Sequence, residues 1–380
     1  VKPDPWKSLR SSVALRVPDD RAPGLAKGVC RLQRPTATST GRTGPATGFE
    51  AKRLRYLQGG RITAVMVWDD VASVPTDWPA SVVTIGVFDG VHRGHRELIR
   101  TAVQRAAVRG VPSVVLTFWP NPVEVVRPGE PPARLATLDQ RLALIAELGV
   151  DAVLVLPFTH EQAQATPEQF AGRVLSDSLG AAEVVVGENF RFGHRARGDV
   201  HTLTELGHRL SFDVLALHLL NTNADGEPVS STMIRKLVAE GEVAAAARAL
   251  VRPHRVEGIV VRGEGRGAPL GFPTANLAAT PFAAIPADGV YAGRIVIDPY
   301  GEPQAHPAAI SVGTNPTFDD VVERRVEAWA YDAGVLDLYD RPIAVDFAAH
   351  VRGQKKFNSE DELVAAVNSD VDQIRRLLGE

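Results

Sequence analysis

Between residues 81 and 186 the chain alternates short apolar runs with helical patterns, and this alternation restricts its fold more than any other feature. Residues 81–87 form a β-branched run, residues 88–94 a glycine-containing turn, and residues 97–108 carry apolar side chains on one helical face. Alternating β and α elements predict a parallel sheet covered by helices. Because such sheets bind ligands at the carboxyl ends of their strands, the turn after Val87 is the first candidate site.

The alternation continues along the first part of the chain and then gives way to a second pattern. Further strands are expected at residues 111–118, 152–156 and 183–186, and further helices at residues 138–148 and 167–179. After about residue 250, strands at residues 255–262, 289–297, 308–313, 325–331 and 343–351, separated by Gly and Pro turns, predict a small β-barrel. A helix over residues 359–378 closes the chain, with Ser359 as N-cap and Glu362 in a capping-box pattern.

These patterns predict two domains, which a length of 380 residues accommodates. We expect a Rossmann-like α/β domain over residues 66–250 and an all-β barrel domain with a C-terminal helix over residues 251–380. Residues 1–64 lack both apolar periods and are interpreted as a disordered or non-native extension. A basic arm that binds an acidic partner is the alternative, since this segment carries 13 Lys/Arg against 4 Asp/Glu.

The charge of the remaining chain argues against a nucleic-acid partner. Outside the net +9 of residues 1–64, the chain carries 29 Lys/Arg against 41 Asp/Glu, a net charge of −12. No apolar run approaches the roughly 18 residues that a membrane helix needs. The single cysteine, Cys30, cannot form an internal disulfide, and no Cys/His cluster has zinc spacing. We therefore expect a cytoplasmic protein with neither nucleic acid nor membrane as partner.

The turn after the first strand contains two histidines three residues apart, His92 and His95. Gly86, Gly90 and Gly94 let the backbone approach a ligand, and the N-terminus of the following helix offers free N–H groups to phosphate. A tight turn with two surface histidines is the alternative interpretation. The position between a strand and a helix, after Phe88 and Asp89, favours a nucleotide site. No P-loop pattern occurs in the chain, so the site is of another kind.

Three segments together resemble the His-x-x-His nucleotidylyltransferases, and among them the adenylyltransferase module of bacterial bifunctional riboflavin kinase/FAD synthetases. They are residues 86–95, residues 186–193 with Gly198-Asp199, and residues 230–235, which read Ser-Ser-Thr-Met-Ile-Arg. The resemblance implies that His92 and His95 hold the α-phosphate of ATP. It implies an ATP site made of Gly86, Phe88, Asp89, Gly90, His92, His95, Ser231, Thr232 and Arg235, and a flavin side made of Asn189, Phe190 and Phe192. Taken alone, Arg235 could be an exposed helix residue, and Ser231 and Thr232 could be helix caps.

The chain departs from this family at three places. Residues 119–122 read Trp-Pro-Asn-Pro where the family often has Asp-Pro-His-Pro, so no histidine role transfers to this segment. Asn189 stands where many members have Asp, and Met233 where many have Arg. We interpret these departures as lineage variation rather than as lost function.

A second glycine-rich segment, residues 262–277, contains Thr274 and Asn276, whose side-chain oxygens lie two residues apart. Oxygen ligands of this type suit Mg²⁺ that carries nucleotide phosphates. A plain barrel loop is the alternative. The string Gly-Phe-Pro-Thr-Ala-Asn at residues 271–276 resembles the flavokinase Pro-Thr-Ala-Asn signature. This resemblance implies a kinase ATP site at Gly267, Gly271, Phe272, Thr274 and Asn276, with Thr274 and Asn276 as metal ligands.

Further segments resemble the flavokinases in order and spacing, at residues 289–291, 313–318, 325–329 and 337–339. By this resemblance Glu327 is the base that accepts the proton of the riboflavin hydroxyl, as phosphoryl transfer requires. The alternative for Glu327 is one more exposed strand carboxylate. Arg352 and Phe357 are expected to close over the flavin, although a surface basic cluster would read the same way.

The resemblance as a whole implies two ATP-dependent reactions with Mg²⁺ as cofactor. Riboflavin would be phosphorylated to FMN at the barrel, and FMN would be adenylylated to FAD, with release of pyrophosphate, at the sheet domain. One alternative is a kinase without adenylylation, and another is a flavin-binding sensor or storage protein without turnover. The oligomeric state does not follow from the sequence.

Overall fold

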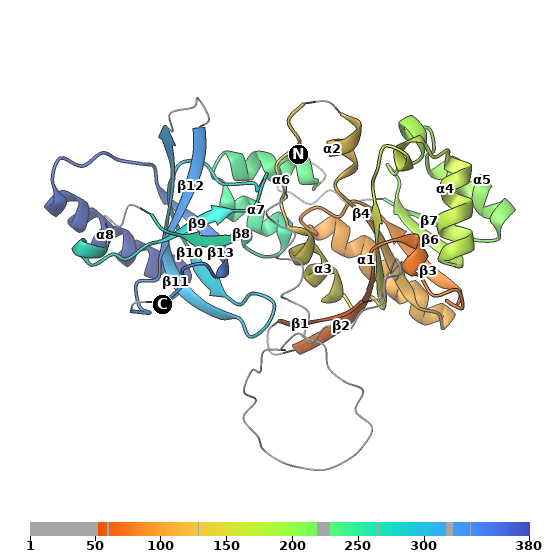
Figure 1. Cartoon of the computed structure of the whole chain (residues 1–380), viewed down its shortest axis with the longest axis horizontal. Helices are drawn as coiled ribbons and strands as arrows, with labels where there is room; N and C mark the ends of the chain where they lie inside the picture. The colour runs from red at the N-terminus through yellow and green to blue at the C-terminus, as the bar shows by residue number, and fades with distance from the viewer. Residues whose placement is uncertain are drawn as a thin grey trace, which may run out of the picture.

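The computed structural model describes residues 52–58, 61–127, 129–218, 229–263, 267–316, 322–334 and 336–380. Two bodies lie side by side, a parallel sheet covered by helices and a closed β-barrel, with short helices between them (Figure 1). This is the α/β domain followed by an all-β barrel that the two sequence patterns predict.

The sheet has seven strands in the order β1-β2-β5-β4-β3-β6-β7, and all neighbours are parallel except β1 and β2. In chain order its strands are β1 (Lys52–Gln58), β2 (Arg61–Trp68), β3 (Ser81–Ile85), β4 (Ser113–Trp119), β5 (Ala152–Pro157), β6 (Ala181–Gly187) and β7 (Asp213–Leu217). The central strands are buried on both sides, which explains why they are mostly apolar without a strict alternation.

Helices cover both faces of this sheet. Alternate residues of β3 face opposite layers, so that Val83 packs in a cluster with Phe170 while Val82 packs in another with Leu98. The helices of this body are α1 (Arg93–Arg109), α2 (Pro122–Val126), α3 (Leu138–Ala146), α4 (Pro167–Phe170), a π-helix (Ala171–Ser178) and α5 (Val200–Leu210). Short 3₁₀ helices lie at Val71–Ser73, Gln162–Gln164, His194–Ala196 and Ala268–Leu270. The helix expected at residues 167–179 is thus α4 continued by a π-helix.

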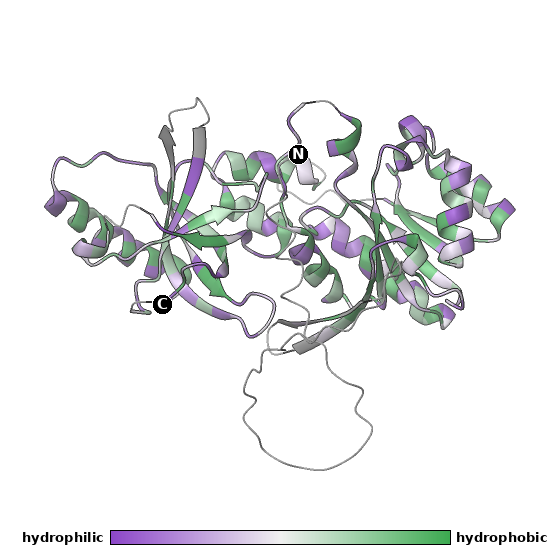
Figure 2. Ribbon diagram, in the orientation of Figure 1, coloured by the Kyte–Doolittle hydropathy of each residue, from purple (hydrophilic) through white to green (hydrophobic). Residues whose placement is uncertain are grey.

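The barrel closes in the order β10-β11-β12-β9-β8-β13, with every neighbouring pair antiparallel. Its strands are β8 (His254–Val261), β9 (Ala275–Ala279), β10 (Gly289–Ile297), β11 (Gln304–Pro316), β12 (Val322–Trp329) and β13 (Pro342–Arg352). Apolar colour runs along the strands of both bodies, and the buried barrel core includes Tyr291, Ile310 and Phe347 (Figure 2). The helix α8 (Glu360–Leu378) packs on the outside, and the Ser359 hydroxyl caps it by accepting from the Glu362 N–H.

Two short helices, α6 (Ser231–Ala239) and α7 (Val243–Leu250), lie between the sheet and the barrel (Figure 1). They share one apolar cluster with residues from both bodies. Leu135 enters it from the segment before α3, Ile234 and Leu250 come from α6 and α7, and Ala284 comes from the barrel side. Burial of this cluster removes apolar surface from water and holds the two bodies together.

The interpretation of residues 1–64 as a disordered extension is wrong for the part that the structure describes, while a non-native origin stays a hypothesis. Residues 52–58 form β1, which pairs with β2, and Tyr56 is only 4% exposed. Leu54 and Tyr56 pack against the same cluster as Val153. Leu54 and Tyr56 alternate with Arg53 and Arg55, which is the two-residue period of a strand. The alternation covers too few residues to be recognised in a basic segment. Residues 1–51 lie outside the described residues.

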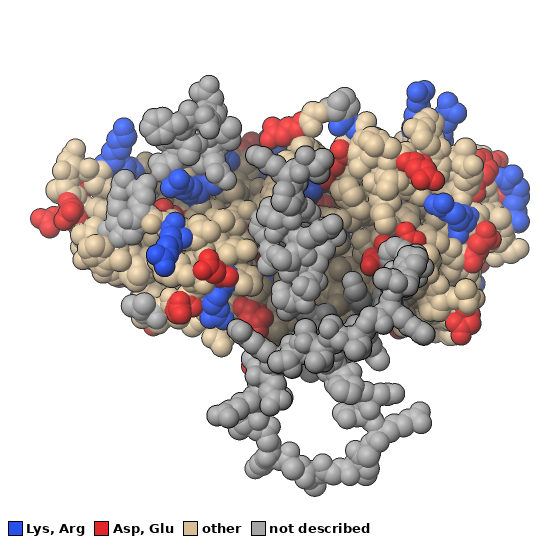
Figure 3. Space-filling view, in the orientation of Figure 1, with Lys and Arg blue, Asp and Glu red and all other residues tan. Residues whose placement is uncertain are grey.

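Basic and acidic side chains are interspersed over the face drawn in Figure 3, as expected for a mixed-charge surface without a large basic patch. Among the described residues, no helix is long and apolar enough to cross a membrane.

Candidate active sites

The loop between β3 and α1 carries the His-x-x-His motif at the carboxyl end of the central strand. Three of its residues have left-handed backbone, Phe88 at φ 52°, Gly90 at φ 80° and Val91 at φ 41°. Such a conformation is costly for residues other than glycine and persists only where the surroundings hold it. Phe88 and Val91 are 1% and 0% exposed, so their side chains anchor the turn in the core.

His92 and His95 lie together at the start of α1. His92 is the N-cap, and its Nδ1 accepts from the backbone N–H of His95 at 3.4 Å. The two rings stack with centroids 3.5 Å apart, and Phe88 meets His95 edge-on. Burial lowers the pKa of His92 to about 4, and burial with the neighbouring cations holds the pKa of His95 well below its usual value. Both imidazoles are therefore neutral at pH 7 and can orient a phosphate by hydrogen bonds.

Asp89 is a buried hub beneath the same loop. Its carboxylate accepts from the N–H groups of Leu135 and Ala136 at 3.1–3.2 Å and from the Arg235 guanidinium at 2.6 Å. The Ser231 hydroxyl donates to the Asp89 carbonyl at 2.9 Å. The third motif thus meets the first, as expected. In this structure, however, Arg235 pairs with Asp89, and sequence reasoning had assigned it only to ATP phosphates.

Two more arginines reach the site, and neither was predicted. Arg141 of α3 is 1% exposed, and its charge lowers the pKa of His95; Arg252, which follows α7, likewise lowers the pKa of His92. The Nε of Arg141 and the Nε and Nη2 of Arg252 are buried without a hydrogen-bond partner. The charges of Asp89 and Glu124 act on Arg141, whereas those of Asp346 and Glu147 act on Arg252. Together with Arg235, these buried cations suit a pocket for anionic phosphates. Arg141 could have been found from the sequence, because it lies among the apolar residues of the helix α3.

The residues predicted on the flavin side follow β6. Asn189 is exposed, and the rings of Phe190 and Phe192 stack with centroids 5.4 Å apart. Phe192 is 7% exposed and packs in the core with Phe170, and its backbone pairs with Gly198. In this structure Phe192 supports the turn that presents Asn189, and its position does not support a direct contact with flavin. Thr232 is exposed on the first turn of α6, and the Ser230 hydroxyl caps that helix.

Three of the residues at which the chain departs from the family, Trp119, Asn121 and Met233, make defined contacts in the structure. The Trp119 ring lies under two guanidinium groups, Arg134 at 4.6 Å and Arg141 at 5.4 Å from the ring centroid. Asn121 caps α2 through the Val123 N–H. Met233 packs against the apolar cluster between the two bodies.

In the barrel, Glu327 and Asn276 lie directly opposite each other on β12 and β9, and Ser311 lies opposite Glu327 on β11. Residues paired in this way lie on the same face of a sheet, so the predicted base and one predicted metal ligand are neighbours. A Cβ added at Gly263 would come within 2.2 Å of the Asn276 amide nitrogen, so a larger residue there would require the Asn276 side chain to move. Gln354, which was not predicted, donates to the Ser311 hydroxyl at 3.1 Å.

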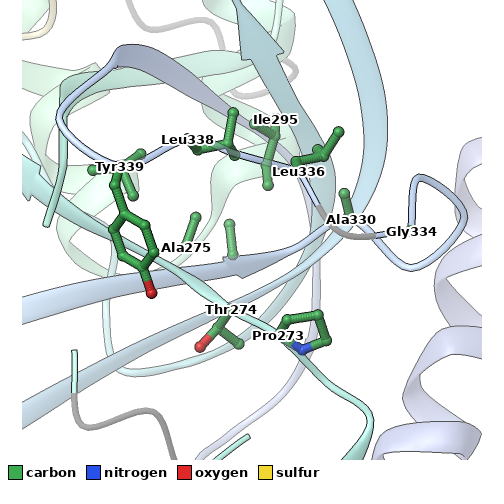
Figure 4. A pocket seen from close by; sticks show the side chains of 11 residues that line it. Pro273, Thr274, Ala275, Ile295, Ala330, Gly334, Leu336, Leu338 and Tyr339 are labelled. Carbon is green, nitrogen blue, oxygen red and sulfur yellow. The ribbon is translucent and has the colours of Figure 1, made fainter. Parts of the chain in front are cut away.

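A small pocket of about 110 Å³ lies on the other face of these strands, where it is lined by the paired residues Ala275 and Ala328 and by Thr274. Figure 4 shows the Thr274 and Tyr339 oxygens on one side of it and the Ile295, Leu336 and Leu338 side chains on the other. Riboflavin needs more room than this, since ligand pockets usually enclose several hundred Å³.

The other residues predicted for the kinase site lie around the glycine-rich segment and at the end of β13. Phe272 packs edge-on against Trp329 with centroids 4.9 Å apart, and its N–H donates to the Gly267 carbonyl at 2.8 Å. Gly271 has φ 88°, which favours glycine. Arg352 donates to Asp370 of α8 at 2.8 Å and lies 5.6 Å from the Phe357 ring. Arg352 and Phe357 are therefore neighbours, and Arg352 is paired with the Asp370 carboxylate. Part of the predicted segment at residues 313–318 lies outside the described residues.

A parallel sheet with a His-x-x-His loop at its carboxyl edge, followed by a barrel with a paired glutamate and asparagine, defines a two-module transferase of nucleotide chemistry. Family models agree module by module: FAD synthetase matches residues 74–233 and riboflavin kinase matches residues 250–378. The chain belongs to the bifunctional riboflavin kinase/FMN adenylyltransferase family, which confirms the resemblance found in the sequence.

Individual relatives support this assignment over most of the chain. The bifunctional riboflavin kinase/FMN adenylyltransferase of Pseudomonas fluorescens is 37% identical over 297 residues, covering 78% of this chain and 92% of the relative. That of Escherichia coli K12 is 35% identical over 298 residues, covering 78% and 93%. A crystal structure titled macrolide-efflux protein, from Streptococcus pneumoniae, superposes with a TM-score of 0.73 at 30% identity, covering 82% of this chain and 98% of that one. It shares the arrangement of both modules.

Proposed function

We propose that this chain makes FMN and FAD by two ATP-dependent reactions, phosphorylation of riboflavin in residues 251–380 and adenylylation of FMN in residues 66–250. ATP is the co-substrate of both reactions. The observation that carries the proposal is the presence of both family matches in one chain, each over its own candidate site. A cytoplasmic location remains a prediction from the sequence.

Adenylyl transfer requires no protein base, because the FMN phosphate is already an anionic nucleophile. Catalysis then depends on positioning and on stabilising the charge that develops at the α-phosphate and on the pyrophosphate. His92 and His95 orient the α-phosphate by hydrogen bonds, and the stacked rings with low pKa values support this neutral role. Ser231, Thr232 and Arg235 face the remaining phosphates, and Arg141 adds buried positive charge.

The kinase reaction requires proton removal as the riboflavin hydroxyl attacks the γ-phosphate. Glu327 accepts this proton, and its place opposite Asn276 supports the assignment. Arg352 and Phe357 border the flavin, and Gly267, Gly271 and Phe272 border the ATP.

Mg²⁺ in the kinase site would be held by Thr274 and Asn276 together with ATP oxygens. The side chains fit such an ion, since Mg²⁺ prefers a few protein oxygens and keeps phosphate and water ligands. The described residues contain no cluster of three or more His, Cys, Asp or Glu that could hold a metal ion. When bound, Mg²⁺ neutralises charge on the phosphates.

A time course tests the proposal. The purified chain is incubated with riboflavin, ATP and Mg²⁺, and the flavins are separated by chromatography. FMN should rise first and FAD should follow, and omission of Mg²⁺ should stop both. FMN without FAD would identify a kinase whose adenylyltransferase departures, at Trp119, Asn121, Asn189 and Met233, disabled the second step. Riboflavin that binds but stays unchanged would identify a flavin-binding protein without turnover.

A further inference from the structure

The adenylyltransferase loop depends on contacts that reach it from outside its own domain. Residues 88–91 contain three left-handed positions, two of them not glycine, so the turn must be held by its neighbours. On one side the Asp89 carboxylate is held by Leu135, Ala136 and Arg235. On the other side the Gly90 carbonyl accepts from Arg252 at 2.9 Å.

Arg252 begins the segment that enters the barrel. Two residues later, His254 opens β8, and its Nε2 donates to the Ala284 carbonyl at 2.7 Å. His254 is 1% exposed, and burial lowers its pKa to about 4, so the ring is neutral at pH 7 and fixed by this one bond. Arg252 is thereby anchored to the barrel as well as to the loop.

The barrel side returns to the loop by a second route. The Ala284 N–H donates to the Arg134 carbonyl at 2.9 Å, and the Arg134 N–H donates to the Phe282 carbonyl at 2.6 Å. The next residue, Leu135, donates its own N–H to Asp89. These bonds close a ring that runs from Gly90 through Arg252, His254, Ala284, Arg134 and Leu135 back to Asp89.

Most of the ring is buried, with His254, Leu135 and Ala284 each at most 4% exposed. The loop is closely packed at Gly90, where an added Cβ would come within 3.0 Å of the Leu135 Cβ and 3.3 Å of Leu250 Cδ2. The Nε and Nη2 atoms of Arg252 are buried without a hydrogen-bond partner, and its Nη1 donates to the Gly90 carbonyl at 2.9 Å and to the Leu250 carbonyl at 3.4 Å. Such a costly burial of a guanidinium suggests a function other than stability.

We propose that Arg252 is a positioning residue for adenylyl transfer, through which the barrel domain fixes the loop that carries His92 and His95. The inference rests on the proposed function and adds a residue to it. Arg252 acts through the Gly90 carbonyl on the backbone of the phosphate-binding turn. The kinase site, which lies among β9, β11 and β12, takes no part in the ring.

The test uses the full chain and measures the two reactions separately. Arg252→Ala should lower kcat for FAD formation from supplied FMN about 10- to 100-fold, as expected for a misplaced loop, with a smaller change in KM. Its kcat for FMN formation should remain within about two-fold of the parent. Arg252→Lys, which keeps one donor for Gly90, should recover part of the lost rate.

Arg248→Ala is the matched control, because Arg248 is an exposed arginine on α7 just before the ring. It should leave both reactions unchanged. As a readout independent of activity, amide hydrogen exchange at residues 88–92 should accelerate in Arg252→Ala but not in Arg248→Ala. The proposal is overturned by an Arg252→Ala protein with unchanged FAD formation, or by one that loses both reactions in parallel with its melting temperature. A parent protein that makes FMN but no FAD would instead overturn the proposed function.

Discussion

The Arg235 guanidinium and the Asp89 carboxylate lie 2.6 Å apart, although 146 residues separate them in the chain. Asp89 is 2% exposed and sits in the turn that carries the two histidines. Arg235 also donates from Nε to the Ala133 carbonyl at 2.6 Å. The pair therefore ties α6 to the loop after β3 and to the segment before α3, and it fixes the floor of the adenylyltransferase site.

Removal of the charge at Asp89 should damage stability and FAD synthesis together. Asp89→Asn leaves the Arg235 guanidinium without its buried counter-ion, which should lower the free energy of unfolding by about 3 kcal/mol. FAD formation should fall, and FMN formation should persist. Urea unfolding and the two product assays measure these effects. Asp213→Asn is the control, because Asp213 is paired with Arg109 but is 71% exposed, so its loss should cost about 1 kcal/mol or less.

Glu327→Gln should separate the two reactions. The substitution keeps the shape of the side chain but removes the base, so FMN formation should fall by about 10²- to 10⁴-fold. FAD formation from supplied FMN should be unchanged, because Glu327 lies on the barrel strand β12. Glu302→Gln, at an exposed position in the same domain, is the control. Equal loss of both reactions in Glu327→Gln would contradict independent sites.

Gly263→Ala should impair the kinase through Asn276. The added methyl group would meet the Asn276 amide at 2.2–2.6 Å, so the asparagine must move away from its place opposite Glu327. We expect a higher KM for ATP–Mg²⁺ and slower FMN formation, with unchanged FAD formation from FMN. Gly353→Ala is the control, since a Cβ at Gly353 meets nothing within 4 Å. Steady-state kinetics of both variants decide the matter.

Stability should decline in mild acid because of buried neutral histidines. Burial lowers the pKa of His92 and His254 to about 4 from the usual 6.5, so the unfolded chain binds more protons than the folded protein between these values. The free energy of unfolding should therefore fall as the pH drops from 6.5 toward 4, by about 1.4 kcal/mol per pH unit for each histidine. Urea unfolding across this range measures the slope. His254→Gln should reduce the slope, and a slope that is unchanged in this variant would contradict the assignment.

Local sequence patterns predicted the elements that are buried on both sides. The run from Val82 to Ile85 consists of β-branched residues, and its strand, turn and helix follow in the expected order. The strand β1 was missed because its few apolar residues, Leu54, Tyr56 and Leu57, lie in a basic segment, and the strand is held by pairing with β2. Local period is a weak signal where tertiary contacts decide the structure.

The site was predictable as a set of motifs and not as a network of bonds. Matching motifs brought His92, Ser231 and Arg235 to one place, but nothing in the sequence indicates that Arg235 is paired with Asp89. The partner of Arg252 could not be predicted either, because it is the backbone carbonyl of Gly90 and every residue has such a carbonyl. Contacts of this kind depend on how distant elements pack.

Because backbone groups of Arg134 and Ala284 join the sheet to the barrel, the two modules are not freely exchangeable parts. In a chimaera that joins the barrel of a relative to this sheet domain, the kinase should work, but the contacts between the two domains, here called the seam, should be disturbed. Only a graft that also transfers residues 133–137 and 252–254 would preserve that seam.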